Sequence, residues 1–141
     1  MGKLLERLND ASRSGVYRSG RSDELLDAVR GSALRVAAID LAGVMGKEEL
    51  MARISRSLAF PSWFGGTWDA LEDCLTDLSW STASGHILLL TNAEALPGDE
   101  RGILLDVLDS AAAWWGGRSR PFFAVFVGGM PALPELYRAG K

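Results

Sequence analysis

The chain has 141 residues, a length that suits one compact domain. Hydrophobic residues make up 48% of it and charged residues 23%, so it can bury a core and wholesale disorder is excluded. Its 15 basic and 18 acidic residues give a net charge of −3, and the lack of a basic surplus argues against a general DNA or RNA binder.

Residues 1–33 are predicted to form an extension that packs on the rest of the chain. The leucines near the start indicate a short helix. Residues 12–20 are rich in turn formers, with room for one short strand. Residues 23–29 have helical spacing, and Gly31 can end that helix.

Residues 34–141 are predicted to form the main domain. The expected strands cover residues 35–41, 86–92 and 121–128, and the expected helices cover 46–58, 67–80 and 100–115. The order is strand, helix, helix, strand, helix, strand. Apolar strands joined by helical crossovers predict an α/β fold with a small three-stranded parallel sheet packed with helices. We expect the first strand to be buried on both faces.

The middle of the chain is strongly acidic. Residues 57–100 contain no Lys or Arg, but they contain Asp69, Glu72, Asp73, Asp77, Glu94, Asp99 and Glu100. At roughly 100° per residue, the first four acids lie on one side of helix 67–80, opposite an apolar stripe that begins at Trp68. Like charges at this spacing cost about 0.2–0.5 kcal/mol per pair in an isolated helix. The stripe is either a solvated face or a surface for a positively charged partner.

An aromatic loop stands directly before this helix. Trp63 and Phe64 lie between Pro61 and a Gly-Gly pair, and we expect one of the two rings to be exposed. Thr67 is the predicted N-cap of the helix. An aromatic anchor beside carboxylates is typical of protein–protein hot spots. Paired carboxylates also attract Arg and Lys side chains that bind phosphate.

Residues 58–78 read Leu-Ala-Phe-Pro-Ser-Trp-Phe-Gly-Gly-Thr-Trp-Asp-Ala-Leu-Glu-Asp-Cys-Leu-Thr-Asp-Leu. This segment closely resembles the signature of the barstar family, and the resemblance extends over about residues 35–128. It implies a cytoplasmic protein inhibitor that plugs the basic active site of a ribonuclease of the barnase type in a one-to-one complex. It implies no catalysis and no cofactor or metal, and no direct contact with nucleic acid or membrane.

The resemblance also implies the residues that bind the partner. Trp63 matches the contacting aromatic residue and Gly65 a glycine close to the partner, while Asp69 and Asp73 match the two key aspartates, with Asp73 as the phosphate mimic. The whole predicted set is Trp63, Phe64, Gly65, Thr67, Asp69, Ala70, Glu72, Asp73, Asp77, Asp109 and Ser110.

The chain departs from the family pattern at several of these positions. Thr67 stands where Asn is common, and both can cap a helix. Glu72 replaces an aromatic residue of the founding inhibitor. The partner-facing acid of the third helix would fall near Ser110, with Asp109 beside it.

Three other interpretations remain open. An enzyme would need Cys74 near His86. The four acids of helix 67–80 could hold Mg²⁺. An interaction module could keep the fold and bind a basic protein other than a ribonuclease. Cys74 is the only cysteine, which excludes an intramolecular disulfide and fits the cytoplasm, and no apolar stretch approaches the ~20 residues that span a membrane.

Overall fold

The computed structural model describes residues 2–20, 22–128 and 130–136. The helices are α1 (Lys3–Leu8), α2 (Ser22–Val29), α3 (Lys47–Leu58), α4 (Trp68–Leu75) and α5 (Gly98–Gly116), with 3-10 turns η1 (Ala11–Arg13) and η2 (Ala93–Ala95). The strands are β1 (Gly15–Ser19), β2 (Leu34–Asp40), β3 (Gly85–Thr91) and β4 (Phe122–Val127). The predicted α/β class and the order from β2 to β4 are confirmed.

The sheet contains four parallel strands in the order β1-β4-β3-β2, so the prediction of three strands was one too few. The additional strand, β1, comes from the N-terminal segment and pairs with β4, with Val16 opposite Ala124. The sequence of β1, Gly-Val-Tyr-Arg-Ser, lacks the alternation of apolar and polar residues that marks strands in a sequence.

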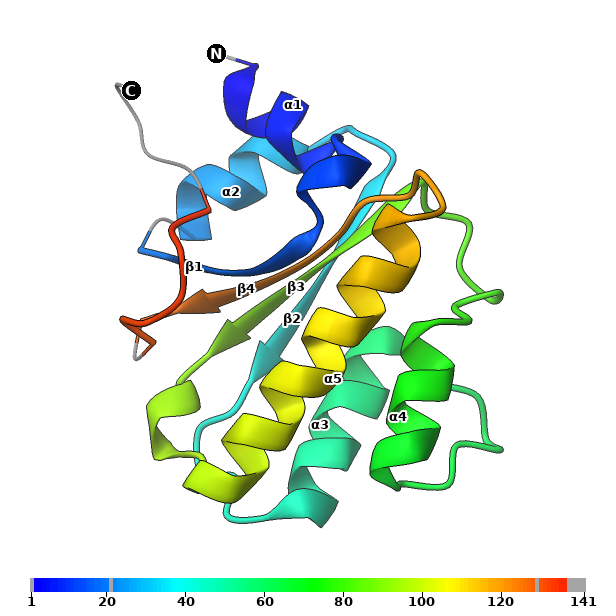
Figure 1. Cartoon of the computed structure of the whole chain (residues 1–141), viewed down its shortest axis with the longest axis vertical. Helices are drawn as coiled ribbons and strands as arrows, with labels where there is room; N and C mark the ends of the chain where they lie inside the picture. Colours follow the sequence, from blue (N-terminus) through cyan, green and yellow to red (C-terminus); the bar gives the residue numbers. More distant parts are fainter. Residues whose placement is uncertain (1, 21, 129, 137–141) are drawn as a thin grey trace.

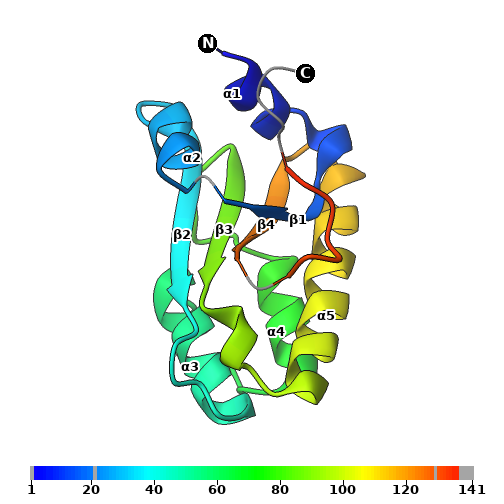
Figure 2. The same ribbon diagram turned by 90° about the vertical axis from the view of Figure 1, so that its left-hand side faces the viewer.

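Helices cover both faces of the sheet (Figures 1 and 2). The helices α3, α4 and α5 lie on one face, and α1 and α2 lie on the other. Side chains of β3 alternate between the two layers: Leu88 and Leu90 join the first core, whereas Ile87 and Leu89 join the second. The N-terminal segment therefore supplies the second helical layer as well as the strand β1.

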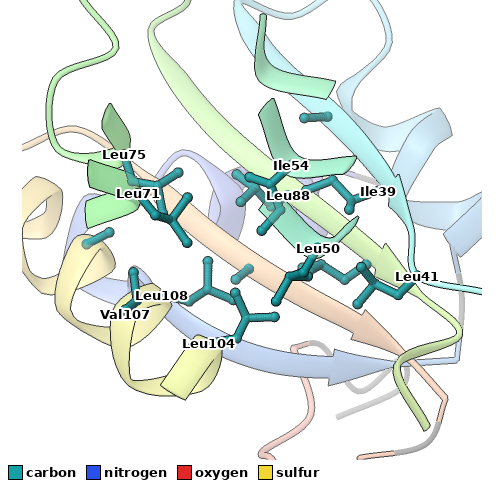
Figure 3. Packing of buried hydrophobic residues seen from close by; sticks show 14 of the residues in the cluster. Ile39, Leu41, Leu50, Ile54, Leu71, Leu75, Leu88, Leu104, Val107 and Leu108 are labelled. Atoms are coloured by element: carbon teal, nitrogen blue, oxygen red, sulfur yellow. The ribbon is translucent and has the colours of Figure 1, made fainter. Parts of the chain in front are cut away.

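The larger core lies beneath α3, α4 and α5 (Figure 3). Each helix contributes apolar residues spaced by three or four positions, as helices with one buried side do. The labelled members of this core are Ile39, Leu41, Leu50, Ile54, Leu71, Leu75, Leu88, Leu104, Val107 and Leu108. The predicted apolar stripe of the second helix is thereby confirmed, because Leu71 and Leu75 are fully buried.

Strand β2 lies at one edge of the sheet, and the prediction that both its faces are buried was wrong. The helices α1 and α2 cover Leu34 and Val36 but leave Ala38 exposed further along the same face. The second helical layer therefore reaches only the first half of the strand.

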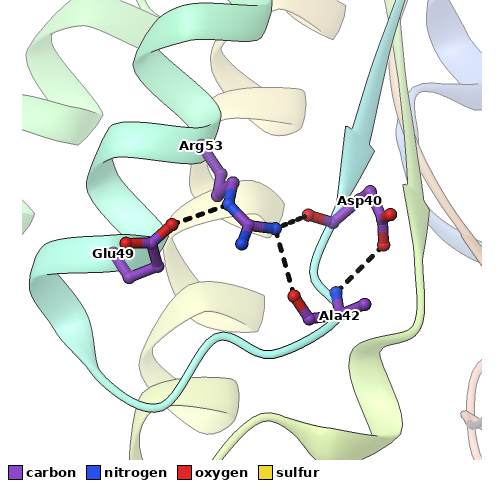
Figure 4. A network of polar contacts seen from close by, with 4 residues as sticks. All are labelled: Asp40, Ala42, Glu49 and Arg53. Atoms are coloured by element: carbon purple, nitrogen blue, oxygen red, sulfur yellow. Dashed lines mark hydrogen bonds and ion pairs between the residues drawn. The ribbon is translucent and has the colours of Figure 1, made fainter.

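Side chains of α3 hold the end of β2 in place (Figure 4). Arg53 pairs with Glu49 at 2.8 Å and donates through Nη1 to the carbonyl oxygens of Asp40 (2.6 Å) and Ala42 (3.2 Å). Hydrogen bonds from the Asn92 amide and the backbone N–H of Ala42 hold the pKa of the Asp40 carboxyl below its usual value. Because Arg53 occupies the carbonyl oxygens of Asp40 and Ala42, another chain is less able to pair with the exposed edge of β2.

No helix in the described part of the chain combines the length and apolar character needed to cross a membrane.

Candidate partner-binding site

The acidic helix α4 begins as the sequence predicted. Thr67 is its N-cap, and the Thr67 hydroxyl accepts a hydrogen bond of 3.0 Å from the backbone N–H of Ala70. Gly66 has φ +76°, which favours glycine in the turn before the helix. At Gly65 an added Cβ would meet only the Cβ of Ala70, at 3.9 Å. A Cβ at Gly65 would therefore make one ordinary van der Waals contact within the chain.

Helix α4 ends at Leu75, five residues before the predicted end at Trp80. The Thr76 hydroxyl donates to the carbonyl oxygen of Glu72 at 2.8 Å, and the N–H groups of Asp77 and Leu78 both point to Cys74 O at 3.2 Å. A further acid at this end would also face the negative end of the helix dipole. Asp77 thus lies in the turn after the helix, and its predicted place on the helical stripe was wrong.

The remaining acids of α4 form one surface, here called the acidic face: Asp69, Glu72 and Asp73. Asp69 and Asp73 are exposed and Glu72 is half-buried. Within residues 2–20, 22–128 and 130–136, no Lys or Arg forms an ion pair with any of them. Their negative charge is therefore not neutralised by a salt bridge in this part of the fold.

Helix α5 borders the acidic face. The Ser110 hydroxyl lies 3.2 Å from Glu72 Oε2 and donates to it, and the exposed Asp109 precedes Ser110 on the same helix. The Trp115 indole donates to the carbonyl oxygen of Leu75 at 2.7 Å, which fixes α4 against α5. Two helices that are distant in sequence thus bring Glu72 and Ser110 into contact.

The aromatic loop exposes one of its two rings, as predicted. Trp63 is 60% exposed, whereas Phe64 is half-buried and packs against the core. The Phe64 ring meets the edge of the Phe60 ring with centroids 4.9 Å apart. The Trp63 indole is therefore exposed to solvent, while the neighbouring Phe64 packs the loop against the core.

Sequence reasoning missed Trp80, which lies beside Trp63. The two ring centroids are 6.3 Å apart and the ring planes are nearly perpendicular. Trp80 also packs edge-on against Phe60 at 5.9 Å. Its only signal in the sequence is that it is a large aromatic residue among small polar residues, because Ser79 precedes it and Ser81 follows it.

The surroundings of Cys74 do not favour it as a nucleophile. Cys74 is fully buried, and burial raises the pKa of its thiol, as do the charges of Asp77 and Asp73. The thiolate is the reactive form, so this environment disfavours a nucleophile. His86 is also buried, and its Nε2 lies 2.8 Å from the Ser81 hydroxyl. Burial, together with the charges of nearby arginines, lowers the pKa of His86 to about 4.

The acids of the α4 region are not arranged around a common point. Among the described residues, no three or more His, Cys, Asp or Glu side chains are grouped so that they could hold a metal ion. This finding covers the four acids that the Mg²⁺ interpretation requires, because Asp69, Glu72, Asp73 and Asp77 are all described.

A family model described as Barstar (barnase inhibitor) matches residues 34–127, about two thirds of the chain. The matched segment runs from β2 to β4 and includes both the aromatic loop and the acidic face. No curated protein matches the sequence.

Proposed function

The chain belongs to the barstar family, and we propose that it inhibits a basic ribonuclease by occluding the active site of that enzyme. The family is one of barnase inhibitors. The observation that carries the proposal is the acidic face, where Asp69 and Asp73 are exposed and form no ion pair with any described residue.

The acidic face can compete for the groups that bind RNA phosphates. An active site that holds a phosphodiester presents Arg and Lys side chains, and these bind carboxylates in the same way. Asp73 takes the place of a phosphate, and Asp69 binds a second cation one helical turn away. Once both are bound, RNA cannot enter the site.

The aromatic loop and α5 form the border of this interface. The exposed Trp63 supplies apolar area beside the charges, which is the composition of an interface hot spot. The exposed Gly65 has no side chain, which lets the partner approach the backbone. Phe64, Thr67 and Ala70 support the interface from the loop and the start of α4.

Glu72, Asp77, Asp109 and Ser110 complete the proposed contact set around this centre. The complex is one-to-one and forms in the cytoplasm of the producing cell. Inhibition requires no chemistry from this chain and no cofactor.

One observation favours a second candidate, an interaction module for a basic protein that is not a ribonuclease. By the resemblance, the chain carries Glu72 where the founding inhibitor has an aromatic residue, and Ser110 near the place of an acid, so the surface differs at the contact between α4 and α5. The two candidates share the acidic face and differ in the partner.

Ribonuclease inhibition separates the two candidates. The purified chain is titrated into barnase, and into a basic ribonuclease encoded beside it, while RNA cleavage is followed. We expect activity to fall linearly to zero at one equivalent for a cognate enzyme. If neither enzyme is inhibited and a basic protein without ribonuclease activity binds the acidic face, the module is the correct function.

A further inference from the structure

We propose that Trp80 is a positioning residue that holds the Trp63 indole in place for the partner. The inference rests on the proposed function, because Trp63 is taken as a contact of that interface. Trp80 belongs to the segment between α4 and β3, whereas Trp63 belongs to the loop between α3 and α4. The two rings meet edge to face at 6.3 Å, within the range of favourable aromatic pairs.

Trp80 is itself firmly held. Its indole N–H donates to the carbonyl oxygen of Leu58 at 3.1 Å, which ties it to the end of α3. The Phe60 ring packs against it edge-on at 5.9 Å. Trp80 is half-buried and packs against the main core, so these contacts restrict the position of its ring.

The chain on either side of Trp80 is held as well. Leu78 is buried with φ +50°, and its carbonyl oxygen accepts a hydrogen bond of 3.0 Å from Ser81 N–H. The Ser81 hydroxyl pairs with the buried His86 at the start of β3 at 2.8 Å. A left-handed leucine costs energy and persists where the surrounding structure requires it. The segment that carries Trp80 is therefore anchored both to the core and to the sheet.

Among the described residues, Trp63 has no side-chain hydrogen bond that would anchor it in the same way. Trp63 is 60% exposed, and the Trp80 ring packs against it. An exposed indole that changes rotamer freely must be ordered when a partner binds. Ordering one such side chain lowers affinity by about two- to tenfold, and a ring already held by Trp80 avoids most of that loss.

The first test measures order in the protein without a partner. Indole ¹⁵N relaxation gives an order parameter for each tryptophan side chain. We expect about 0.8 for Trp63 in the unsubstituted protein, a value below about 0.6 in Trp80→Leu, and recovery in Trp80→Phe, which keeps an aromatic edge. Trp114→Leu, on α5, serves as the control and leaves Trp63 unchanged.

Two results of this test would overturn the inference. The first is an order parameter for Trp63 that is no higher in the unsubstituted protein than in Trp80→Leu. The second needs no variant and so does not depend on whether Trp80→Leu folds. It is the absence of nuclear Overhauser contacts between the rings of Trp63 and Trp80 in the unsubstituted protein.

The second test measures inhibition of barnase, or of the neighbouring ribonuclease if that is the enzyme inhibited, in a double-mutant cycle. Trp80→Leu should raise the inhibition constant about two- to tenfold, and it should add little once Trp63→Ala is present. An equal effect in both backgrounds contradicts positioning. If the chain inhibits no ribonuclease, the proposed function fails, while the relaxation result still decides whether Trp80 orders Trp63.

Discussion

The Ser110 hydroxyl on α5 donates a hydrogen bond of 3.2 Å to the Glu72 carboxylate on α4. By the resemblance described above, these are two positions at which the chain departs from the family pattern: Glu72 stands in place of an aromatic residue, and Ser110 near the place of an acid. Because the two side chains touch, the departures amount to one local change. Glu72, a member of the acidic face, places a carboxylate from α4 beside Ser110.

This contact predicts a coupled effect on inhibition. Glu72→Gln should weaken inhibition by about ten- to a hundredfold, because a hydrogen bond to a charged group contributes about 1.5–3 kcal/mol. Ser110→Ala should weaken it less, and it should have no further effect in a Glu72→Ala background, where the side-chain acceptor of the Ser110 hydroxyl is gone. Inhibition constants of the single and double variants measure the coupling.

The control for this pair is Glu94→Gln, which removes the same charge from an exposed residue of η2. If Ser110→Ala has the same effect with and without Glu72, the hydrogen bond does not position the carboxylate.

The acidic face predicts a salt-dependent association rate. Residues 57–100 carry seven acids and no Lys or Arg, so a basic enzyme is attracted over a distance. Stopped-flow association should approach ~10⁸ M⁻¹s⁻¹ at low salt and fall steeply as the Debye length shortens to about 10 Å at 0.1 M. Asp69→Asn should reduce this slope more than Asp23→Asn on α2. A rate that does not change with salt would contradict electrostatic steering.

The second helical layer predicts unequal effects at two adjacent leucines of α2. Leu25 is 1% exposed in the second core, whereas Leu26 is 39% exposed. Leu25→Ala should lower the free energy of unfolding by about 2–5 kcal/mol, because it leaves a cavity. Leu26→Ala should lower it by less than about 1 kcal/mol, since alanine and leucine have similar helix propensity. If urea unfolding shows that Leu25→Ala lowers the free energy of unfolding no more than Leu26→Ala does, burial of Leu25 in this layer does not stabilise the fold.

Burial of His86 predicts a loss of stability in mild acid. Its pKa is about 4 in the folded protein and 6.5 in the unfolded chain, so the unfolded chain takes up the proton first as pH falls. The free energy of unfolding should therefore decrease between pH 6.5 and 4, by up to about 3 kcal/mol, with no contribution from His86 above that window.

The comparison variant for this prediction is His86→Gln, which keeps a hydrogen-bonding side chain beside Ser81. Urea unfolding at several pH values should give a flatter pH dependence for this variant. Carboxyls with lowered pKa, such as Asp40, contribute equally to both proteins and cancel in the difference. Identical pH profiles would show that His86 is not the group responsible.

Local sequence signals predicted the part of the site that depends on local structure. Thr67 caps α4 because a side-chain oxygen three residues before an N–H can reach it wherever the chain turns into a helix. The exposed Trp63 follows from its place in a loop broken by proline and glycine. Both features depend on residues close together in the chain, so a sequence is sufficient to find them.

Features that depend on distant residues were not predictable in this way. A short strand was expected within residues 12–20, but the place of β1 in the sheet depends on β4, which pairs with it on one side. On the other side, residues near the C-terminus bond to the backbone of Arg18, through Pro134 O at 2.8 Å and Leu136 N–H at 2.9 Å. Trp80 joins the site through contacts with α3 and its following loop. The early end of α4 is a local feature by contrast: the Asp77 N–H bonds to Cys74 O, three residues back, where a continuing helix would use Asp73 O.

The central claim is that Asp73 takes the place of an RNA phosphate in the active site of a basic ribonuclease. The most direct measurement compares inhibition by Asp73→Asn with inhibition by Asp23→Asn, a matched loss of one charge on the opposite side of the sheet. We expect Asp73→Asn to raise the inhibition constant more than a hundredfold, because it leaves buried cations of the enzyme unpaired at a cost of about 3 kcal/mol or more. We expect Asp23→Asn to change the inhibition constant less than about threefold. Equal inhibition by the two variants would contradict the claim.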